Sequence, residues 1–475
     1  MSGTADEQLR LDSSRGRWTL AITVLGSSIV FLDSTVVNMA LPAIGREFDA
    51  SFASLQWTVN GYLLALAALI ILGGSFGDRF GRRRMFVLGT AWFTFASVLC
   101  GLAPSSEVLI AARVLQGVGG ALLTPGSLAI IEASFVSVER GRAIGLWSGL
   151  SGVSTAAGPL LGGYLIDAVS WRAIFYLNVP IGLLVIVTAM RHVPESFGVR
   201  SSRIDLGGAF LVALGLAGTS FALIEAPELG AGSAEVLVSA TVGLIALIAF
   251  VIVERRVREP MLPLSIFQSK PFTAANLVTF VVYAALAGVF FMQGVFFQIS
   301  LGYSPLEAGM SGLPVTALLL LFSSRAGALA QRVGARPLLT GGAVVITVAI
   351  LMMRSIDPGD SYWTGVLPSM IVFGVGLVGI VAPVTATALS SAPTEHAGLA
   401  SAVNNAVARA GQLIAIALLP AVAGLAGSEY EDPAAMTGAF HDAMLATAVL
   451  SAIGAVVAWT MIGRDVLKLE DAAAG

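Results

Sequence analysis

Charged residues are scarce in this chain of 475 residues: only 12% are Asp, Glu, Lys or Arg, whereas 56% are hydrophobic. Soluble domains usually carry about 25% charged residues. So small a charged share, together with a mean hydropathy of +0.87, excludes an ordinary water-soluble protein. The composition therefore predicts a chain that is solvated largely by lipid.

Residues that build reactive or metal sites are nearly absent. The single cysteine, Cys100, excludes a disulfide framework and a thiolate metal site, and the three scattered histidines match no zinc spacing. Neither of the two lysines, Lys270 and Lys468, follows a glycine, so the chain has no phosphate-binding G-x-x-x-x-G-K-[ST] loop. The net charge of −3 argues against nucleic-acid binding. We therefore expect no metal, cofactor, catalytic residues, ATP-driven motor or nucleic-acid partner.

Long apolar runs are what the chain has instead. Stretches of about 20 apolar residues, the length that crosses a bilayer, occur fourteen times. The polar segment 1–17 precedes a run that is too long for the core of a signal peptide, so we expect no cleavage. The expected spans are 18–40, 54–76, 85–103, 108–131, 143–166, 172–190, 206–226, 235–253, 272–299, 306–328, 337–354, 363–387, 398–425 and 440–462.

Arginine and lysine fall mainly on one side of these spans. With the N-terminus in the cytoplasm, 21 of the 26 basic residues lie in inside segments. Only Arg46, Arg172 and Arg354 lie outside, and Arg113 and Arg409 lie within spans. Because cytoplasmic loops are enriched in basic residues, this asymmetry predicts that both termini are cytoplasmic.

A short motif occurs twice. The stretch GSFGDRFGRRR at 74–84 matches GALAQRVGARP at 327–337, with Gln331 in place of Asp78. Ser51 and Ser304 align at the same offset, so the helix before each copy has the same length. Two homologous halves are common in transporters, whose substrate site lies between the halves.

Several motifs together resemble the major facilitator superfamily. GGSFGDRFGRRR is similar to its loop between helices 2 and 3, LIAARVLQGVGGAL to its helix-4 motif, and SGVSTAAGPLLGGYL to the helix-5 motif of drug–proton antiporters. LDSTVVNMALP and WRAIFYLNVPIG resemble the branch of those antiporters that has fourteen helices.

This resemblance implies an all-α integral membrane fold of two six-helix bundles with a two-helix insert between them. The family exports hydrophobic, often cationic, compounds in exchange for protons. We expect such a protein to be a monomer in the lipid bilayer of a bacterial cytoplasmic membrane. The expected parts are a cytoplasmic segment 1–17, bundles 18–190 and 272–463, the insert with its linkers at 191–271, and a tail 464–475.

Asp33 and Arg113 are charged residues inside expected spans, where an unpaired charge costs a few kcal/mol or more. Asp33 lies about seven residues from the outer end of its span, and Arg113 about five residues into a span that enters from that side. They therefore share a depth and are natural partners. A static ion pair and a direct substrate contact remain alternatives, but the pattern favours a carboxylate that takes up and releases the coupling proton.

Small residues recur along 143–166. Glycines four apart allow close helix packing, and a proline bends the helix. The resemblance implies, in addition, a seal between the halves that prevents leakage, and export as the direction of transport. The residues of this antiporter motif are Gly152, Gly158, Pro159, Gly162 and Gly163.

The basic turn and one C-terminal span carry the other candidate residues. A charge run of this kind ordinarily reflects topology alone, but the resemblance implies a cytoplasmic gate formed by Gly74, Asp78, Arg79, Gly81, Arg82 and Arg83. In the span 398–425, a structural polar network is expected from Asn404, Asn405, Arg409 and Gln412.

Two other functions remain open at this stage. The chain could export a single secondary metabolite made by its own cell. It could also be a membrane sensor that moves no substrate, although no soluble stretch exceeds about 20 residues. An enzyme is not expected, because no nucleophile–base pair or metal cluster falls within the spans.

Overall fold

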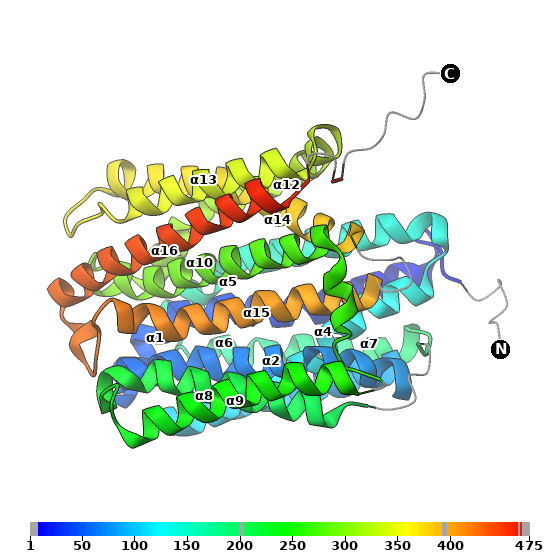
Figure 1. Cartoon of the computed structure of the whole chain (residues 1–475), viewed down its shortest axis with the longest axis horizontal. Coiled ribbons are helices and arrows are strands. Elements are labelled where there is room, and N and C mark those ends of the chain that lie inside the picture. Colours follow the sequence, from blue (N-terminus) through cyan, green and yellow to red (C-terminus); the bar gives the residue numbers. More distant parts are fainter. Residues whose placement is uncertain (1–7, 199–203, 258, 392–396, 464–465, 468–475) are drawn as a thin grey trace.

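The structure, a computed structural model, describes residues 8–198, 204–257, 259–391, 397–463 and 466–467. Within these ranges the chain is helical and contains no strand. The helices run side by side along the long axis of the molecule (Figure 1). They are α1 (Ser14–Phe48), α2 (Phe52–Phe80), α3 (Arg82–Leu102), α4 (Ser106–Ser134), α5 (Ser137–Ala168), α6 (Ala173–Tyr176), α7 (Asn178–His192), α8 (Leu206–Leu229), α9 (Ala234–Arg256), η2 (Leu264–Gln268), α10 (Lys270–Ile299), α11 (Pro305–Ser311), α12 (Leu313–Val333), α13 (Ala335–Met353), η3 (Tyr362–Val366), α14 (Leu367–Ser390), α15 (Ala397–Val422), η5 (Glu429–Glu431) and α16 (Pro433–Met461).

Among the described residues, thirteen helical stretches are long and apolar enough to cross a membrane, and they correspond to thirteen of the expected spans. The remaining expected span, 143–166, lies within α5, whose run SGLSGVSTAAGPLLGG is rich in small and hydroxyl residues. At 1.5 Å per residue the 32 residues of α5 extend about 48 Å, which is enough to cross. The all-helical prediction is confirmed, whereas the count of fourteen and the cytoplasmic termini stay predictions.

The division into two halves and an insert also stays a prediction. The N-terminal half denotes residues 18–190, the C-terminal half residues 272–463, and the insert the α8–α9 hairpin. The first seven residues of the segment 1–17 and most of the tail 464–475 lie outside the described residues.

The repeated motif has the same local structure in both halves. α2 begins after an N-cap at Ser51, and α11 after an N-cap at Ser304, each hydroxyl accepting a backbone N–H of the first turn. At the other end of each unit, α2 stops at Gly81 with φ +108°, and α12 stops at Gly334 with φ +89°. Only glycine adopts this conformation without strain, so the aligned glycines fix where both helices end.

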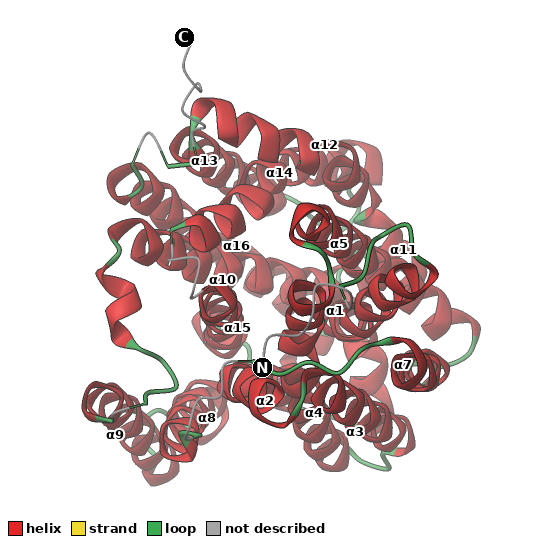
Figure 2. Ribbon diagram, turned by 90° about the vertical axis from the view of Figure 1, so that its right-hand side faces the viewer, coloured by secondary structure: helices red, strands yellow, loops and turns green. Residues whose placement is uncertain are grey.

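Helices pack mainly within their own half. α2 and α3 pack on α4, and α1 packs on α5; in the C-terminal half, α13 packs on α14, and α10 on α15 and α16. Figure 2, which looks along the helices, shows the hairpin of α8 and α9 at the edge of the bundle. α8 contacts α2 of one half and α15 of the other, so the insert lies on the seam between the halves.

The long helices give the molecule two ends. We call the end at residues 48–52, where α1 stops and α2 starts, the sealed end. The opposite end carries the arginine-rich turn 80–84 and is called the basic end. α1 starts and α16 stops at the basic end (Figure 1).

Hydrogen bonds join the two halves in the part of the bundle nearer the sealed end. Nε2 of Gln56 on α2 donates to the carbonyl of Ile416 on α15 at 2.7 Å. Nε2 of Gln298 on α10 donates to the carbonyl of Met39 on α1 at 3.0 Å. The Gln56 side chain is buried, so its amide would be costly inside a membrane protein without such an acceptor.

The loop before α16 adds two more bonds between the halves. The Phe52 amide donates to the Gly427 carbonyl at 2.8 Å, and the Tyr430 hydroxyl donates to the Ala50 carbonyl at 3.0 Å. Burial, with Glu431 nearby, raises the pKa of Tyr430 to about 12. The hydroxyl therefore remains a donor at neutral pH, and this contact is insensitive to physiological changes of pH.

Toward the sealed end, α5 packs closely on both halves. A Cβ atom placed on Gly158 or Gly162 would collide with α1, and one on Gly163 would collide with the backbone of α11. The carbonyl of Pro159 lies against Gly309 of α11. Small residues therefore let three helix backbones meet at the seam.

Toward the basic end, α5 is open. A Cβ atom on Gly145, Gly149 or Gly152 would meet no atom within 4 Å. Gly152 was expected to belong to the same packed motif as Gly158, but it does not share that packing in this conformation. One helix thus has a packed segment and an open segment.

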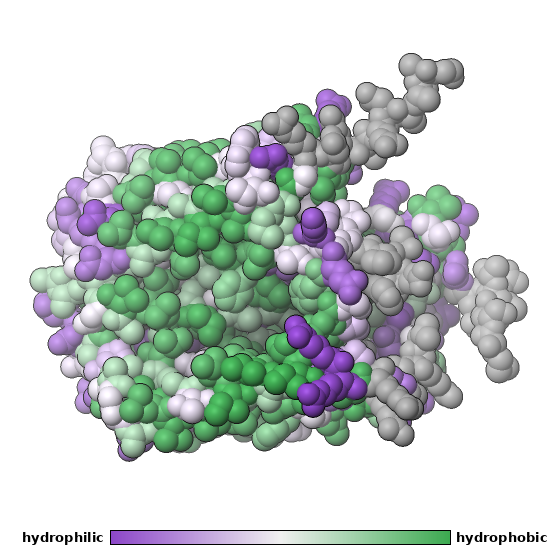
Figure 3. Space-filling model, in the orientation of Figure 1, coloured by the Kyte–Doolittle hydropathy of each residue, from purple (hydrophilic) through white to green (hydrophobic). Residues whose placement is uncertain are grey.

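Apolar side chains also cover the outside of the bundle. Figure 3 shows a broad hydrophobic band between two polar ends. On α9, Leu244, Ile245 and Ile248 are each more than half exposed. Exposed apolar surface of this extent is unfavourable in water and is normal for a protein that faces lipid.

Gly163→Ala should destabilise the protein by about 1–3 kcal/mol, because the new methyl group meets rigid backbone of α11. Gly145→Ala on the same helix is the matched control, since it has free space and gains up to about 1 kcal/mol of helix propensity. The thermal unfolding midpoint of both variants in detergent measures the difference. Equal destabilisation of the two variants would contradict this account of α5.

Candidate functional site

Asp33 and Arg113 form an ion pair inside the N-terminal half. Nη1 of Arg113 lies 2.5 Å from Oδ2 of Asp33. The side chain of Asp33 is 0% exposed and that of Arg113 is 1% exposed. The two side chains that were expected at one depth are therefore in direct contact, and both are removed from solvent.

Two amide side chains hold the other oxygen of Asp33. Nε2 of Gln116 on α4 donates to Oδ1 at 2.9 Å, and Nδ2 of Asn178 on α7 donates to it at 3.1 Å. Both amides also donate to the hydroxyl of Ser97 on α3. Both oxygens of Asp33 therefore accept hydrogen bonds, one from a cation and the other from two amides.

Arg113 is fixed on its other side by α2. Its Nε donates to the carbonyl of Thr58 at 3.1 Å, and its Nη1 also donates to Oε1 of Gln116 at 2.6 Å. The guanidinium lies 4.4 Å from the ring centroid of Tyr62, within cation–π range. The position of Arg113 therefore depends on α1, α2 and α4 together.

This arrangement links the charge of Asp33 to the position of Arg113. Taking one ion from water into a protein interior costs several kcal/mol, and good pairing geometry must offset that cost. If Asp33 gains a proton, Arg113 keeps Thr58 and Gln116 but loses its counter-ion. A buried cation without a counter-ion is unstable, so protonation favours a rearrangement of this cluster.

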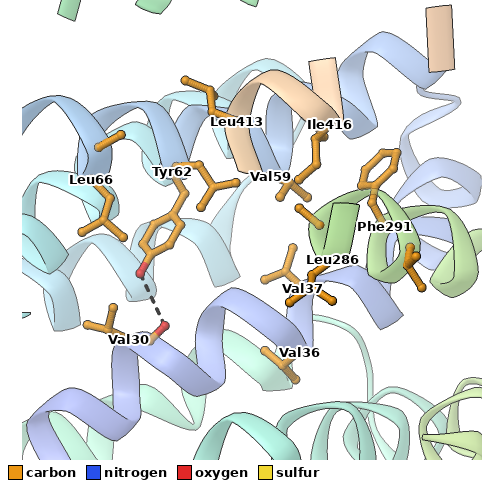
Figure 4. Packing of buried hydrophobic residues seen from close by; sticks show 14 of the residues in the cluster. Val30, Val36, Val37, Val59, Tyr62, Leu66, Leu286, Phe291, Leu413 and Ile416 are labelled. Carbon is orange, nitrogen blue, oxygen red and sulfur yellow. Dashed lines mark hydrogen bonds between the residues drawn. The ribbon is translucent and has the colours of Figure 1, made fainter. Parts of the chain in front are cut away.

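Tyr62 separates the ion pair from the C-terminal half. Its hydroxyl donates to the carbonyl of Val30 at 3.4 Å (Figure 4). In the same view Leu413 and Ile416 of α15 approach α2 beside Tyr62 and Val59. Tyr62 therefore contacts the ion pair at one side and lies at the interface between the halves at the other.

Arg409 reaches this interface from α15. Its Nη1 donates to Oε1 of Gln412 at 3.0 Å, and its Cζ lies 5.9 Å from the ring centroid of Phe31 on α1. Within the described ranges no acidic side chain forms an ion pair with Arg409, although its side chain is only 8% exposed.

The polar residues expected to form one network on α15 form separate contacts. Nδ2 of Asn404 donates to Thr279 at 2.9 Å and to Asn276 at 3.2 Å, both on α10. Asn405 donates to the carbonyl of Ser401 on its own helix. Arg409 and Gln412 lie farther along α15 and share no hydrogen bond with either asparagine, because the three groups face different neighbours.

The residues of the implied gate surround the turn between α2 and α3. Oδ1 of Asp78 accepts from Nη2 of Arg82 at 2.8 Å, in an (i, i+4) pair across the turn. Nη1 of Arg82 also donates to the carbonyl of Ala129 on α4 at 3.0 Å. These contacts join α2, α3 and α4 of the N-terminal half.

Glu195, in the segment after α7, completes the turn. It accepts the backbone N–H of Arg83 at 2.9 Å, and its carboxylate would collide with any Cβ atom on Gly81. Gly74 packs on α4, while the Arg79 guanidinium lies over an aromatic ring of its own helix. In this conformation, therefore, the contacts of Asp78, Arg82 and Glu195 stabilise the N-terminal half.

Three residues of these clusters were missed by sequence reasoning. Gln116 follows Arg113 by three positions, so the two share a helix face, and that spacing could have identified it. Asn178 lies within the quoted WRAIFYLNVPIG, but no spacing relates it to Asp33. Glu195 had no sequence signal. In the part of the chain that the structure describes, no three His, Cys, Asp or Glu residues group as metal ligands would.

Arg113→Gln should cost about 3–5 kcal/mol of stability, because it leaves a buried carboxylate without its counter-ion. The double variant Asp33→Asn with Arg113→Gln should regain most of that loss, since two neutral amides can hydrogen-bond to each other. Thermal or denaturant unfolding of the two single variants and the double variant measures the coupling. Additive losses would show that the pair is not energetically coupled.

Comparison with known proteins identifies the family. A sequence profile of the Major Facilitator Superfamily matches residues 23–416. The multidrug resistance protein Stp of Mycobacterium tuberculosis (strain CDC 1551 / Oshkosh) is 35% identical over 410 residues, which cover 85% of this chain and 75% of Stp. The methylenomycin A resistance protein of Streptomyces coelicolor is 36% identical over 451 residues, which cover 93% of this chain and 92% of that protein. The crystal structure of a D-xylose–proton symporter matches with a TM-score of 0.66 at 15% identity, covering 96% of this chain and 100% of the symporter.

These findings agree with the sequence and the fold. The profile spans most of the chain, and both bacterial relatives are similar over most of its length. Together with the lipid-matched exterior they indicate a multi-pass protein of the cell membrane, and a transporter rather than an enzyme. The chain therefore belongs to the major facilitator superfamily.

Proposed function

We propose that this protein is an antiporter that exports hydrophobic or amphipathic, often cationic, small molecules in exchange for protons. The observation that carries the proposal is the fully buried carboxylate of Asp33, paired with Arg113 inside the membrane-spanning bundle. Ionisable residues at such depth are costly, and they typically belong to a proton relay or a substrate path. The proton is the only coupling ion in this proposal, and no ATP is used.

The proton step is a transfer to and from the carboxylate of Asp33. A proton from the outer side binds one oxygen, which until then accepts a hydrogen bond from Arg113, Gln116 or Asn178. When the site faces the cytoplasm, the proton leaves and Arg113 regains its counter-ion. Because Arg113 stacks on Tyr62, the rearrangement reaches the interface between the halves through one side chain.

Alternating access would come from rocking of the two halves about the seam. Here the halves are joined nearer the sealed end by Gln56 and Gln298, and the Leu306 amide of α11 donates to Asp167 of α5 at 2.9 Å. α5 is open toward the basic end. We propose that the basic end is cytoplasmic, so this is the conformation that receives substrate from inside the cell.

The relatives support a drug-like substrate. One is named for multidrug resistance and the other for resistance to methylenomycin A. The aromatic rings of Phe31 and Tyr62 lie at the interface between the halves and would contact an apolar body. Arg409 repels a cation at its own position, so a cationic substrate is expected to bind nearer to Asp33.

Export of a single secondary metabolite is the second candidate function. It is favoured by the name of the methylenomycin A resistance protein, which refers to one compound and matches this chain over nearly its full length. The two functions share one mechanism and differ in the breadth of the substrate range. Since both halves belong to one chain, the proposed transport unit is a monomer.

Asp33→Asn should abolish substrate-driven proton movement, because the amide keeps the shape of the side chain and cannot take up the proton. The variant should also lose stability, since Arg113 loses its counter-ion, so transport is measured on the folded fraction only. The measurement uses purified protein in liposomes with an imposed proton gradient and a pH-sensitive dye inside. Ethidium, a tetracycline and a neutral hydrophobic drug are added in turn.

Glu107→Gln, which removes an exposed carboxylate at the start of α4, is the matched control and should behave like the wild type. Proton flux that persists unchanged in Asp33→Asn would refute the assignment of Asp33. No flux with any compound, in folded wild-type protein, would favour the single-metabolite exporter first and a non-transporting sensor second.

A further inference from the structure

The base of the insert hairpin holds two carboxyl groups that the transport mechanism does not use. Asp205 is the N-cap of α8, and Glu254 lies in the last turn of α9. Both therefore lie at the basic end of the hairpin, next to the linker that leads to α10. The side chain of Glu254 is buried, with 3% exposure.

One oxygen of each carboxyl group has an ordinary partner. Oδ1 of Asp205 accepts the backbone N–H of Gly208 at 2.7 Å, which caps the helix. Oε2 of Glu254 accepts the backbone N–H of Leu262 at 2.8 Å, which attaches the linker to the hairpin. These two bonds fix how the carboxyl groups are oriented.

The other two oxygens face each other without a donor. Oε1 of Glu254 and Oδ2 of Asp205 are buried and accept no hydrogen bond from any described residue. Both are the nearest atoms to the position that a Cβ atom would occupy on Gly208, so they meet over this glycine. The two side chains are within hydrogen-bonding reach of each other.

Two carboxylates cannot form a hydrogen bond, because neither carries a donor. Two like charges in a buried site also repel, and such pairs commonly share one proton. A proton on either oxygen supplies the missing donor and removes one of the charges. One added hydrogen atom therefore satisfies both orphaned oxygens.

In the part of the chain that the structure describes, no positive charge pairs with either carboxyl group. Among the described residues, neither Asp205 nor Glu254 forms an ion pair, and the cations that follow on α9, Arg255 and Arg256, are exposed. The linker contributes one further acid, Glu259. A metal ion fits poorly, because the third group at the site is the Leu262 N–H, which is a donor rather than a ligand.

We propose that Asp205 and Glu254 form a proton-binding site, which holds one shared proton at neutral pH and fastens the linker to the base of the insert hairpin. This site lies outside the Asp33 cluster and does not depend on transport. Loss of the proton at alkaline pH would leave two charges over Gly208 and weaken the attachment of Leu262. The insert would then respond to pH at the end of the molecule that we assign to the cytoplasm.

Infrared spectroscopy of the purified protein tests the proposal directly. Asp33→Asn serves as the background, so that Asp33 contributes no carboxyl signal. At neutral pH the background protein should show a protonated-carboxyl C=O band that is lost on adding Glu254→Gln and, separately, on adding Asp205→Asn. Glu235→Gln, at the exposed start of the same helix, is the matched control and should remove only carboxylate bands.

A pH series of thermal midpoints gives a second readout that does not rely on the spectrum. In Glu254→Gln the amide oxygen can accept the Leu262 N–H while the amide nitrogen donates to Asp205, so its midpoint should stay level from about pH 6 to about pH 9. The wild-type midpoint should fall from about pH 6 relative to Glu254→Gln and level off once the pair has lost its proton, because until then the folded state holds a proton that the unfolded carboxyl groups have released.

Two results would overturn the proposal. One is that neither Glu254→Gln nor Asp205→Asn removes any protonated-carboxyl band. The other is that Ca²⁺ or Mg²⁺ raises the midpoint of the wild type but not of Glu254→Gln, which would make the pair a cation site. Neither result bears on proton-coupled export, which is measured separately in liposomes with Asp33→Asn.

Discussion

A carboxylate and a guanidinium buried together inside the helical bundle impose the strongest constraint on this molecule. Neither Asp33 nor Arg113 is stable there without the other, and the pair is stable only if the remaining lone pairs and protons are satisfied. Thr58 of α2, Gln116 of α4 and Asn178 of α7 supply those partners, and Ser97 of α3 accepts from both amides. The packing of the N-terminal half is therefore coupled to one charge. Changing that charge would disturb a hydrogen-bonding network that joins α1, α2, α3, α4 and α7.

The seam between the halves is held together by a different kind of interaction. In lipid, helices gain little from hiding apolar surface, so they associate through close backbone approach and hydrogen bonds. Near the sealed end α5 has both kinds of contact, with glycines against α1 and α11 and Asp167 accepting from α11. Toward the basic end the glycines of α5 face open space. Since the packed contacts are individually small, a conformational change can exchange them for others at moderate cost, unlike the ion pair.

Local rules explain what could be predicted from the sequence. Hydropathy located the helices, and the repeat correctly paired Ser51 with Ser304 and Gly81 with Gly334, because caps and positive-φ turns depend on a few adjacent residues. Helix rise placed Asp33 and Arg113 at one depth. Contacts between different helices could not be predicted from the sequence. Asn178 and Glu195 join their clusters only through the packing of α7 and of the segment after it. For the same reason Asn404 and Arg409, on one helix, face different neighbours. α5 is less hydropathic than the other thirteen stretches, because small and hydroxyl residues lower its hydropathy where they allow close packing.

The insert is held in place by both hydrogen bonds and helix packing. Near the sealed end, the Trp57 indole donates to Glu225 of α8 at 2.8 Å, and Ile224 packs with Ala53 of α2 and Ala417 of α15. α8 therefore contacts both halves close to the bonds made by Gln56, the region that would separate in the outward-open state. At the basic end the hairpin is tied to its own linker through Glu254. A hairpin anchored in this way opposes separation of the halves at one end and leaves them free at the other. In the proposed rocking motion it would favour the conformation open at the basic end, and a group that changes how the hairpin is held would change that preference.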